Sequence, residues 1–227
     1  MDANTEAIVR LCFARQLGLA DDALEADGRV TVVRDDQVMT LRLWRTHVLV
    51  APAPLLPALS ALDAGALADP SALLSLCGTG RVVGAARLSV LDELDRHPDL
   101  ERLEVDPDPD AATALEQRCP PDDVTEVGLS RMDTVFVHRA PDGTPCSGAG
   151  YAVWAGLVAN LGVLSALEAR RRGLARVLAG IAVNDALDAG LVPAWRVGPG
   201  NAAAERLGDA LGFSPVGDQV TVELTPG

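Results

Sequence analysis

Apolar positions along the second half of the chain recur with two different periods, which predicts strands alternating with helices. Short, mostly apolar runs that end at Gly, Pro or Asp are typical of strands. The predicted strands span residues 134–138, 146–154, 157–165, 191–197 and 220–224. From Leu174 onward the apolar residues recur every three or four positions, which predicts an amphipathic helix. The Pro141-Asp142-Gly143 turn should join the first two strands as a hairpin.

The first half predicts a helix, several strands and two short helices. The helix spans Thr5–Leu19, and strands are expected at residues 29–33, 38–44, 47–51 and 81–88. Short helices should end at Leu62 and follow the Asp69-Pro70 cap, and two more should cover residues 111–118 and 120–129. The breaker Asp106–Pro109 suggests a boundary. We therefore expect an N-terminal α/β extension or divergent half at 1–105 and a core at 106–227.

One stretch, Arg170–Ala175, combines arginines with a glycine between a predicted strand and a predicted helix. The first N–H groups of a helix have no partner inside it, and the helix dipole adds positive charge there. Gly173 has no Cβ, so an anion can approach the backbone closely. A phosphate fits such a turn well.

The order Arg170-x-x-Gly173-x-Ala175 resembles the pyrophosphate signature of the GCN5-related N-acetyltransferase (GNAT) family. Val163-Leu164-Ser165 stands where that family ends the preceding strand. The segment from Asn201 to Gly212-Phe213 is similar to its next helix and the Gly-Phe pair that follows. The resemblance covers about 126–224. It implies an α/β (α+β) fold with a mixed, mostly antiparallel, splayed and twisted sheet flanked by helices.

The resemblance also implies acetyl-CoA, or another acyl-CoA, as the co-substrate. Backbone N–H groups at the end of the strand would hold the thioester carbonyl, and the loop would hold the pyrophosphate. The residues implied are Val163, Leu164, Ser165, Arg170, Arg171, Arg172, Gly173, Leu174, Ala175, Arg176 and Asn201. Asn201 is equally well explained as the N-cap of its own helix. The arginines at 170–172 could bind the adenosine 3′-phosphate or pair with Glu168.

There are two candidates for proton transfer, the first of which follows from the same resemblance. Glu126 lies where related sequences place a Glu that can act as a general base, although a carboxylate on a helix face explains it as well. Tyr151, the chain's single Tyr, could line the acceptor site, donate a proton or simply pack on its strand. The family often has a Tyr at the position of Gly208 to protonate the leaving thiolate. Its absence means that another group or water supplies the proton, or that catalysis is weak or lost. A change of Gly208 to Tyr is expected to alter turnover in an enzyme and to do little in a non-catalytic binder.

Composition narrows the classes of partner. The chain has 19 basic residues, all Arg, and 32 acidic ones, giving a net charge of −13 that disfavours nucleic-acid binding and suits a cationic acceptor. Acidic residues are densest between residues 92 and 133, where they could form a rim that attracts an amine or, more simply, a solvated linker and helix face. Four Cys and three His are scattered, so no metal site is expected. No apolar run is long enough to span a membrane and no signal peptide is recognisable, so we expect a cytoplasmic location.

The resemblance to the GNAT family implies an N-acyltransferase that moves an acetyl or other acyl group from acyl-CoA to a primary amine by direct attack. The acceptor would be a small molecule or a peptide, and a homodimer is left open. The alternative is a non-catalytic acyl-CoA-binding regulatory protein on the same fold. An unrelated α/β nucleotide binder would need its phosphate loop after the first strand, and here the loop comes late in the chain.

Overall fold

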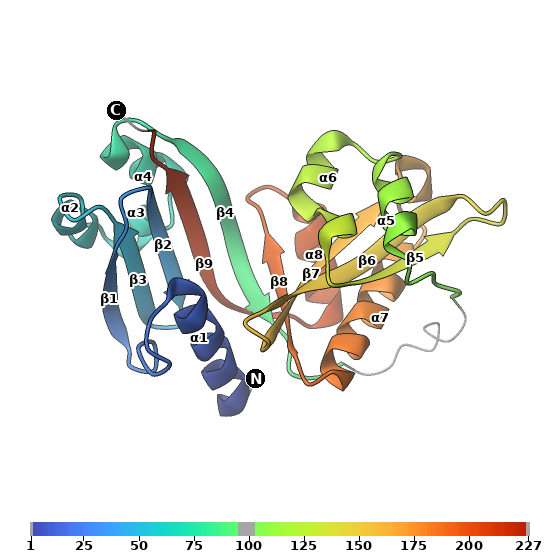
Figure 1. Cartoon of the computed structure of the whole chain (residues 1–227), viewed down its shortest axis with the longest axis horizontal. Coiled ribbons are helices and arrows are strands. Elements are labelled where there is room, and N and C mark those ends of the chain that lie inside the picture. The colour runs from blue at the N-terminus through green and yellow to red at the C-terminus, as the bar shows by residue number, and fades with distance from the viewer. Residues whose placement is uncertain (1, 95–102, 226–227) are drawn as a thin grey trace. The chain divides into compact units, whose positions relative to one another are not determined.

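A computed structural model describes residues 2–94 and 103–225, so part of the acidic stretch lies outside the described residues. The chain forms two compact units (Figure 1). The first unit contains Met1–Cys12, Val90–Trp195 and Ala203–Ser214, and the second contains Phe13–Ser89, Arg196–Ala202 and Pro215–Gly227. The chain therefore passes between the units more than once.

The sheet of the first unit runs in the order β8-β7-β6-β5. Its strands are β5 (Thr134–Arg139), β6 (Pro145–Trp154), β7 (Val158–Ser165) and β8 (Val192–Val197). The β5–β6 and β6–β7 pairs are antiparallel, whereas β7 and β8 are parallel. The helices are α5 (Pro109–Glu116), α6 (Pro121–Val127), α7 (Leu174–Asp188) and α8 (Ala202–Leu211), and the 3₁₀ turns are η1 (Leu129–Arg131) and η2 (Leu167–Ala169).

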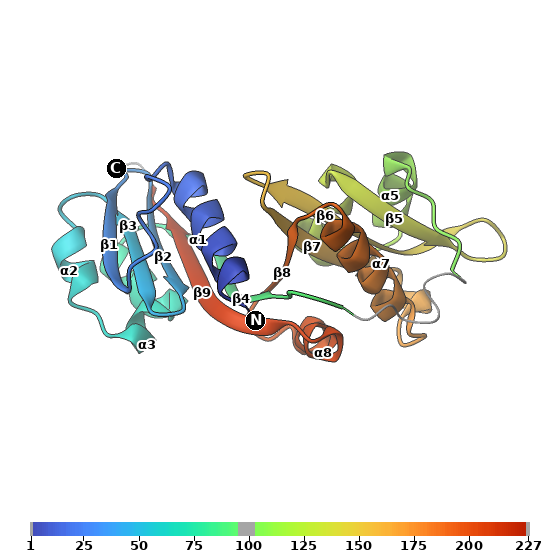
Figure 2. The same cartoon turned by 90° about the horizontal axis from the view of Figure 1, so that it is seen from below.

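Helices cover both faces of this sheet (Figure 2). On one face, Tyr151 of β6 donates a hydrogen bond to Asp185 of α7. On the other face, α5, α6 and η1 come so close that three strand positions have no room for a side chain. A Cβ on Gly162 of β7 would lie 2.4 Å from Met132 Cε and 2.9 Å from Val127 Cγ1. Gly148 and Gly150 of β6 are similarly crowded. Glycine at these positions allows the helices to pack directly on the strands.

The second unit is built on the strand order β1-β3-β2-β9-β4. The strands are β1 (Gly28–Val33), β2 (Gln37–Leu43), β3 (Thr46–Ala51), β4 (Arg81–Val90) and β9 (Ser214–Glu223). The helices are α1 (Ala3–Leu17), which begins in the first unit, α2 (Leu56–Ser60), α3 (Ala64–Leu67) and α4 (Pro70–Cys77). Figure 2 shows α1 and the helices α2 and α3 on opposite sides of these strands.

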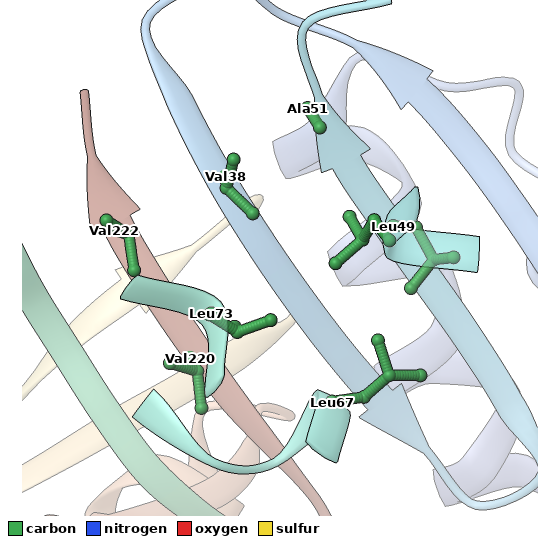
Figure 3. Close-up of a cluster of buried hydrophobic side chains, with 8 residues drawn as sticks. Val38, Leu49, Ala51, Leu67, Leu73, Val220 and Val222 are labelled. Carbon is green, nitrogen blue, oxygen red and sulfur yellow. The ribbon is translucent and has the colours of Figure 1, made fainter. Parts of the chain in front are cut away.

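The side facing α2–α4 is closed by aliphatic side chains (Figure 3). Because strand residues alternate between faces, Val38 of β2 and Val220 and Val222 of β9 point the same way. They contact Leu59, Leu67 and Leu73 from the three short helices, and all six side chains are at most 3% exposed. Burying a Leu or Val side chain contributes about 1.5–3 kcal/mol, so this cluster holds the short helices on the sheet.

The mixed, mostly antiparallel sheet flanked by helices confirms the predicted fold class. The hairpin of β5 and β6 and the long helix from Leu174 are confirmed as well. The Asp69 cap is present, since its carboxylate accepts a hydrogen bond from the Ser71 N–H at 2.9 Å. The main differences from the prediction are that α3 was not predicted and that β9 starts at Ser214 rather than at residue 220. The helix predicted over 120–129 is divided into α6 and the 3₁₀ turn η1.

Candidate functional site

The parallel strands β7 and β8 pair only along their first half. Their register runs from Val158 opposite Val192 to Leu161 opposite Trp195, and β7 then continues to Ser165. Beyond Leu161, the backbone of β7 is therefore no longer paired with β8 in this register. Such a splayed pair can receive an extended ligand between its strands, because backbone N–H groups without a partner strand line it.

Alternation along β7 identifies which N–H groups face this opening. The Leu157 carbonyl accepts from the Val192 N–H at 3.0 Å, so odd-numbered residues face β8. The Ala166 N–H donates to the Cys146 carbonyl at 3.0 Å, so even-numbered residues face β6. The N–H groups of Val163 and Ser165 consequently point into the opening, whereas that of Leu164 points toward β6. Of the three predicted residues, two present a donor there and the third packs in the core.

The segment between β7 and α7, residues 166–173, forms what we call the arginine loop. It turns through η2 and ends at Gly173, the N-cap of α7, whose φ of 81° is left-handed. Arg171 is left-handed too, with φ of 62°, a conformation that is rare for a residue with a side chain. A Cβ on Gly173 would meet no atom within 4 Å, so the backbone here borders open space. The first N–H groups of α7 and its dipole are directed to this point.

Two ion pairs tie the arginine loop to α6 and to the segment that follows α5. Arg118 lies 2.5 Å from Glu168, and Arg170 pairs with Asp123. Arg170 also donates from Nε to the Ser165 carbonyl at 3.2 Å. The side chain of Arg170 thus connects β7 and α6 to the loop. These contacts favour a structural role for Arg170 over binding of a phosphate.

The other predicted arginines lie on the surface. Arg171 and Arg172 are exposed within the loop, and Arg176 is exposed in the first turn of α7. Together with the helix N-terminus they form a positive patch on a chain whose net charge is −13. This patch could attract a phosphate electrostatically, and arginine could bind it in a bidentate fork.

Tyr151 and Glu126 lie on opposite faces of the sheet. The Tyr151 phenol donates to Asp185 Oδ2 at 2.6 Å on the α7 face, and its side chain is 4% exposed. Burial and this hydrogen bond raise the pKa of Tyr151 above its usual value. Glu126 is exposed on α6, whose neighbouring Val127 packs against Gly162 on the other face. The structure therefore does not bring these two candidates together.

Asn201 belongs to the second unit, just before α8. Its backbone N–H donates to the Gly198 carbonyl at 3.2 Å. The predicted role of its side chain as a cofactor ligand stays a prediction.

Position 208 in α8 is filled by a neighbouring indole. A Cβ on Gly208 would lie 2.9 Å from Cδ1 of Trp195 and 3.1 Å from its Nε1. Trp195 is held there by a hydrogen bond from Nε1 to the Ala204 carbonyl at 3.1 Å and by Phe213, whose ring centroid is 5.7 Å away. A tyrosine at 208 would have to displace this indole. A Gly208→Tyr variant would therefore disturb the packing of Trp195, so its turnover would not report on proton transfer alone.

Asn160 of β7 is a polar residue that the sequence reasoning missed. Its Oδ1 is buried without a hydrogen-bond partner. Alternation places it on the same face as Gly162, toward α6, and opposite Ala194 of β8 at the closed end of the opening. Buried amide oxygens are normally satisfied, so this atom remains available to accept a hydrogen bond from a ligand or water. In the sequence, a single Asn within an otherwise apolar strand was the signal that could have identified this residue.

Thiol nucleophiles are disfavoured close to the loop. Burial raises the pKa of Cys119 to about 11, and burial raises the pKa of Cys146 too. Both thiols are protonated near neutral pH, and a protonated thiol is a poor nucleophile. Within residues 2–94 and 103–225, no group of three His, Cys, Asp or Glu side chains could hold a metal ion. No helix in the described part of the chain has the length and apolarity needed to cross a membrane.

The sequence matches no protein-family model, and no curated protein matches it. The structure is similar to those of many GNAT proteins. One is an acetyltransferase assigned to the GNAT family from Novosphingobium aromaticivorans, which is 25% identical, with a TM-score of 0.51 over 65% of this chain and 68% of that one. Another is a GCN5-related N-acetyltransferase-like protein from Streptococcus suis, which is 16% identical, with a TM-score of 0.52 over 85% of both chains.

These likenesses agree with the motif evidence on one point. The resemblance rested on Arg170, Gly173 and Ala175, and the structure places them where a splayed strand pair leads into the N-terminus of a long helix. The two similar solved structures superpose on 65% and 85% of this chain. The chain therefore has the fold of the GNAT family of N-acetyltransferases.

Proposed function

We propose that the protein is an N-acyltransferase that transfers an acetyl or other acyl group from acyl-CoA to a primary amine. The observation that carries the proposal is the continuous path from the splayed edge of β7 to the N-terminus of α7. Donors at Val163 and Ser165 line one end of this path, and the open backbone at Gly173 forms the other. An extended ligand with a carbonyl at one end and phosphates at the other matches this order of groups.

Each end would do a different part of the work. The acyl-CoA supplies a thioester, whose carbonyl the amine nitrogen attacks. The N–H groups of Val163 and Ser165 would stabilise the negative charge that develops on the carbonyl oxygen. The new C–N bond then remains while the C–S bond breaks and the thiolate leaves. The arginine loop and the first turn of α7 would hold the pyrophosphate and so fix the thioester in position.

Direct attack is favoured over a covalent enzyme intermediate. The thiols of Cys119 and Cys146 are held protonated by burial, so neither is an activated nucleophile. The leaving thiol has a reference pKa of about 8.5, so water can supply its proton without a dedicated acid. This removes the need for a tyrosine at position 208, where Trp195 occupies the space.

The amine is proposed to enter through the opening between β7 and β8, because Met132 and Val127 close the face of β7 itself at Gly162. The buried Oδ1 of Asn160 there could accept a hydrogen bond from an amine N–H. Glu126, exposed on α6, is proposed as the group that accepts the proton released by the amine. Tyr151 lies on the opposite face with Asp185 and is the weaker candidate for proton transfer.

A pair of glycine variants tests the phosphate end. Gly173 and Gly190 bracket α7, both have left-handed φ (81° and 75°), and neither has a neighbour within 4 Å of a built Cβ. Gly173→Ala and Gly190→Ala should therefore cost similar stability, about 1 kcal/mol. We expect calorimetric titration to show acetyl-CoA binding at least tenfold weaker in Gly173→Ala and unchanged in Gly190→Ala.

Two results would contradict this proposal. One is wild-type protein that fails to bind acetyl-CoA at millimolar concentration. The other is equal weakening by both glycine variants, which would mean that the loop has no special part in binding. CoA lacking the 3′-phosphate, titrated in parallel, reports whether the surface arginines contact that group.

A non-catalytic acyl-CoA-binding protein is the second candidate. The filled space at Gly208 favours it, because no tyrosine is available there to protonate a thiolate. Release of free thiol from acetyl-CoA in the presence of a panel of primary amines separates the two functions. An enzyme releases thiol in proportion to the amine acylated, whereas a sensor binds acetyl-CoA with no turnover.

A further inference from the structure

The second unit contains a cavity of about 370 Å³ that the acyl transfer does not use. Its lining is Phe13, Gln16, Leu17, Arg34, Gln37, Met39, Leu41 and Gln219. We propose that this cavity binds a small carboxylate attached to an apolar body, independently of the acyl-CoA site. The volume lies in the range of small-molecule sites, about 300–1,000 Å³.

The floor of the cavity is one face of the sheet. Gln37, Met39 and Leu41 are alternate residues of β2, so they point to the same side. Gln219 of β9 stands directly opposite Leu41 in the antiparallel register and shares that side. The other side of the same strands forms the aliphatic cluster with α2–α4 (Figure 3). Only the side toward the cavity carries amides on these two strands.

The roof of the cavity is the last turn of α1. Phe13, Gln16 and Leu17 are spaced i, i+3 and i+4, which puts them on one helix face. Arg34, directly after β1, closes the rim, and its guanidinium donates to the Leu17 carbonyl at 3.1 Å. This bond fixes Arg34 against the end of α1. A guanidinium has five N–H donors, so others can serve a ligand.

The polar groups of the lining suit an anion. Three of the chain's four glutamines gather here, with one arginine. Among the described residues that line the cavity, no carboxylate is present. A cavity that carries positive charge within a chain of net charge −13 would attract a negative ligand locally. Amide N–H groups and a guanidinium fork are the donors that a carboxylate accepts best.

The side-chain NH₂ group of Gln219 donates hydrogen bonds to a weak acceptor and to a distant one. Its Nε2 donates to the Met39 thioether sulfur at 3.2 Å and to the Thr221 hydroxyl at 3.4 Å. A thioether is a weak acceptor, so a carboxylate oxygen in the cavity would make a stronger bond. Its Oε1 accepts from the guanidinium of Arg196 at 3.5 Å, which keeps the NH₂ group turned toward Met39. Phe13, Leu17 and Leu41 would contact the apolar body.

Methionine methyl groups provide a local readout. The chain has three Met, of which Met39 lies in this cavity and Met132 packs against Gly162 in the first unit. With ¹³C-methyl methionine in the full chain, NMR titration with 3-phenylpropanoate should shift the Met39 signal saturably and leave the Met132 signal in place. Met39→Leu assigns the signal. The same skeleton as an amide, 3-phenylpropanamide, should bind at least about tenfold more weakly, because it loses a charge-assisted hydrogen bond.

Matched arginine variants complete the test. Arg34→Gln should weaken binding of 3-phenylpropanoate about tenfold, whereas Arg45→Gln, at an 85% exposed side chain of the same unit, should not. The proposal is overturned if the Met39 signal does not move, if 3-phenylpropylamine shifts it as strongly as the carboxylate, or if Arg34→Gln binds as tightly as the wild type. None of these measurements uses acyl-CoA, so their outcome is independent of acyl transfer.

Discussion

At the scale of single residues, Tyr151 shows how a neighbour limits the chemistry of a side chain. As the chain's single tyrosine on a core strand, it was a natural candidate for a proton donor. Its hydroxyl instead donates to Asp185 on the α7 face, and its side chain is 4% exposed. A phenol whose pKa is raised in this way holds its proton firmly. This favours a role in attaching α7 to the sheet.

Tyr151→Phe tests that role. The variant loses one hydrogen bond, so we expect the free energy of unfolding to fall by about 0.5–1.5 kcal/mol, with turnover per folded molecule unchanged. The raised pKa sets the pH dependence. Stability from the phenol is fully present below its unfolded pKa of about 10 and is lost as pH rises through the higher folded value. Urea unfolding at pH 8 and above pH 10 should show the wild type losing its advantage over Tyr151→Phe.

Asp185→Asn is the matched control for this prediction. The amide oxygen can still accept from the phenol, so the hydrogen bond is kept while the carboxylate charge is removed. We expect Asp185→Asn to be more stable than Tyr151→Phe at pH 8. A loss of turnover of a hundredfold or more in Tyr151→Phe, with stability unchanged, would instead assign the phenol to catalysis.

At the scale of elements, the turn from β7 into α7 separates two kinds of arginine. Arg170 is engaged with Asp123 and the Ser165 carbonyl, whereas Arg172 is exposed beside Gly173. In the sequence the two residues cannot be distinguished, because both belong to the same run of three arginines. Only the packing of α6 against the loop distinguishes them, because Asp123 is distant in sequence and its position depends on the fold.

Glutamine variants of these two arginines test the distinction. We expect Arg172→Gln to weaken acetyl-CoA binding about tenfold and to make it less salt-dependent, because a charge near the phosphates is lost. Arg170→Gln should weaken binding about threefold or less with an unchanged salt dependence, since exposed ion pairs contribute about 0–1 kcal/mol. Asp123→Asn should reproduce the effect of Arg170→Gln in the same titrations. If Arg170→Gln removed the salt dependence and Asp123→Asn had no effect, Arg170 would be a phosphate ligand.

The same contrast explains which elements the sequence could predict. Long periodic segments and capped helices, such as those starting at Leu174 and Pro70, are local properties and were predicted correctly. The four-residue helix α3 was not, since its stability comes from burying Leu67 in the aliphatic cluster. The start of β9 was also missed, because Ser214-Pro215 reads as a turn, whereas pairing with β2 already begins at Gly217.

At the scale of the whole molecule, the order of motifs predicted the fold. It did not predict which residues form each of the two compact units. Motifs report on local chemistry, whereas the second unit gathers residues 13–89 with two short segments from near the C-terminus. The filled space at Gly208 and the buried amide of Asn160 depend on side chains from other elements, so no local pattern could reveal them. The cavity beneath α1 was missed for the same reason.

The net charge of −13 leads to a prediction about the acceptor. Long-range attraction raises the encounter rate of oppositely charged molecules, about tenfold or more at low salt, and salt screens it. For a dicationic amine we therefore expect kcat/KM for acyl transfer to fall about tenfold between about 0.02 and 0.2 M salt. A zwitterionic amine of the same length, measured alongside, should change much less. Steady-state thiol release with saturating acetyl-CoA is the measurement. Equal salt dependence for both amines would mean that the acidic surface does not guide the acceptor, and that its recognition is confined to short-range contacts such as the buried oxygen of Asn160.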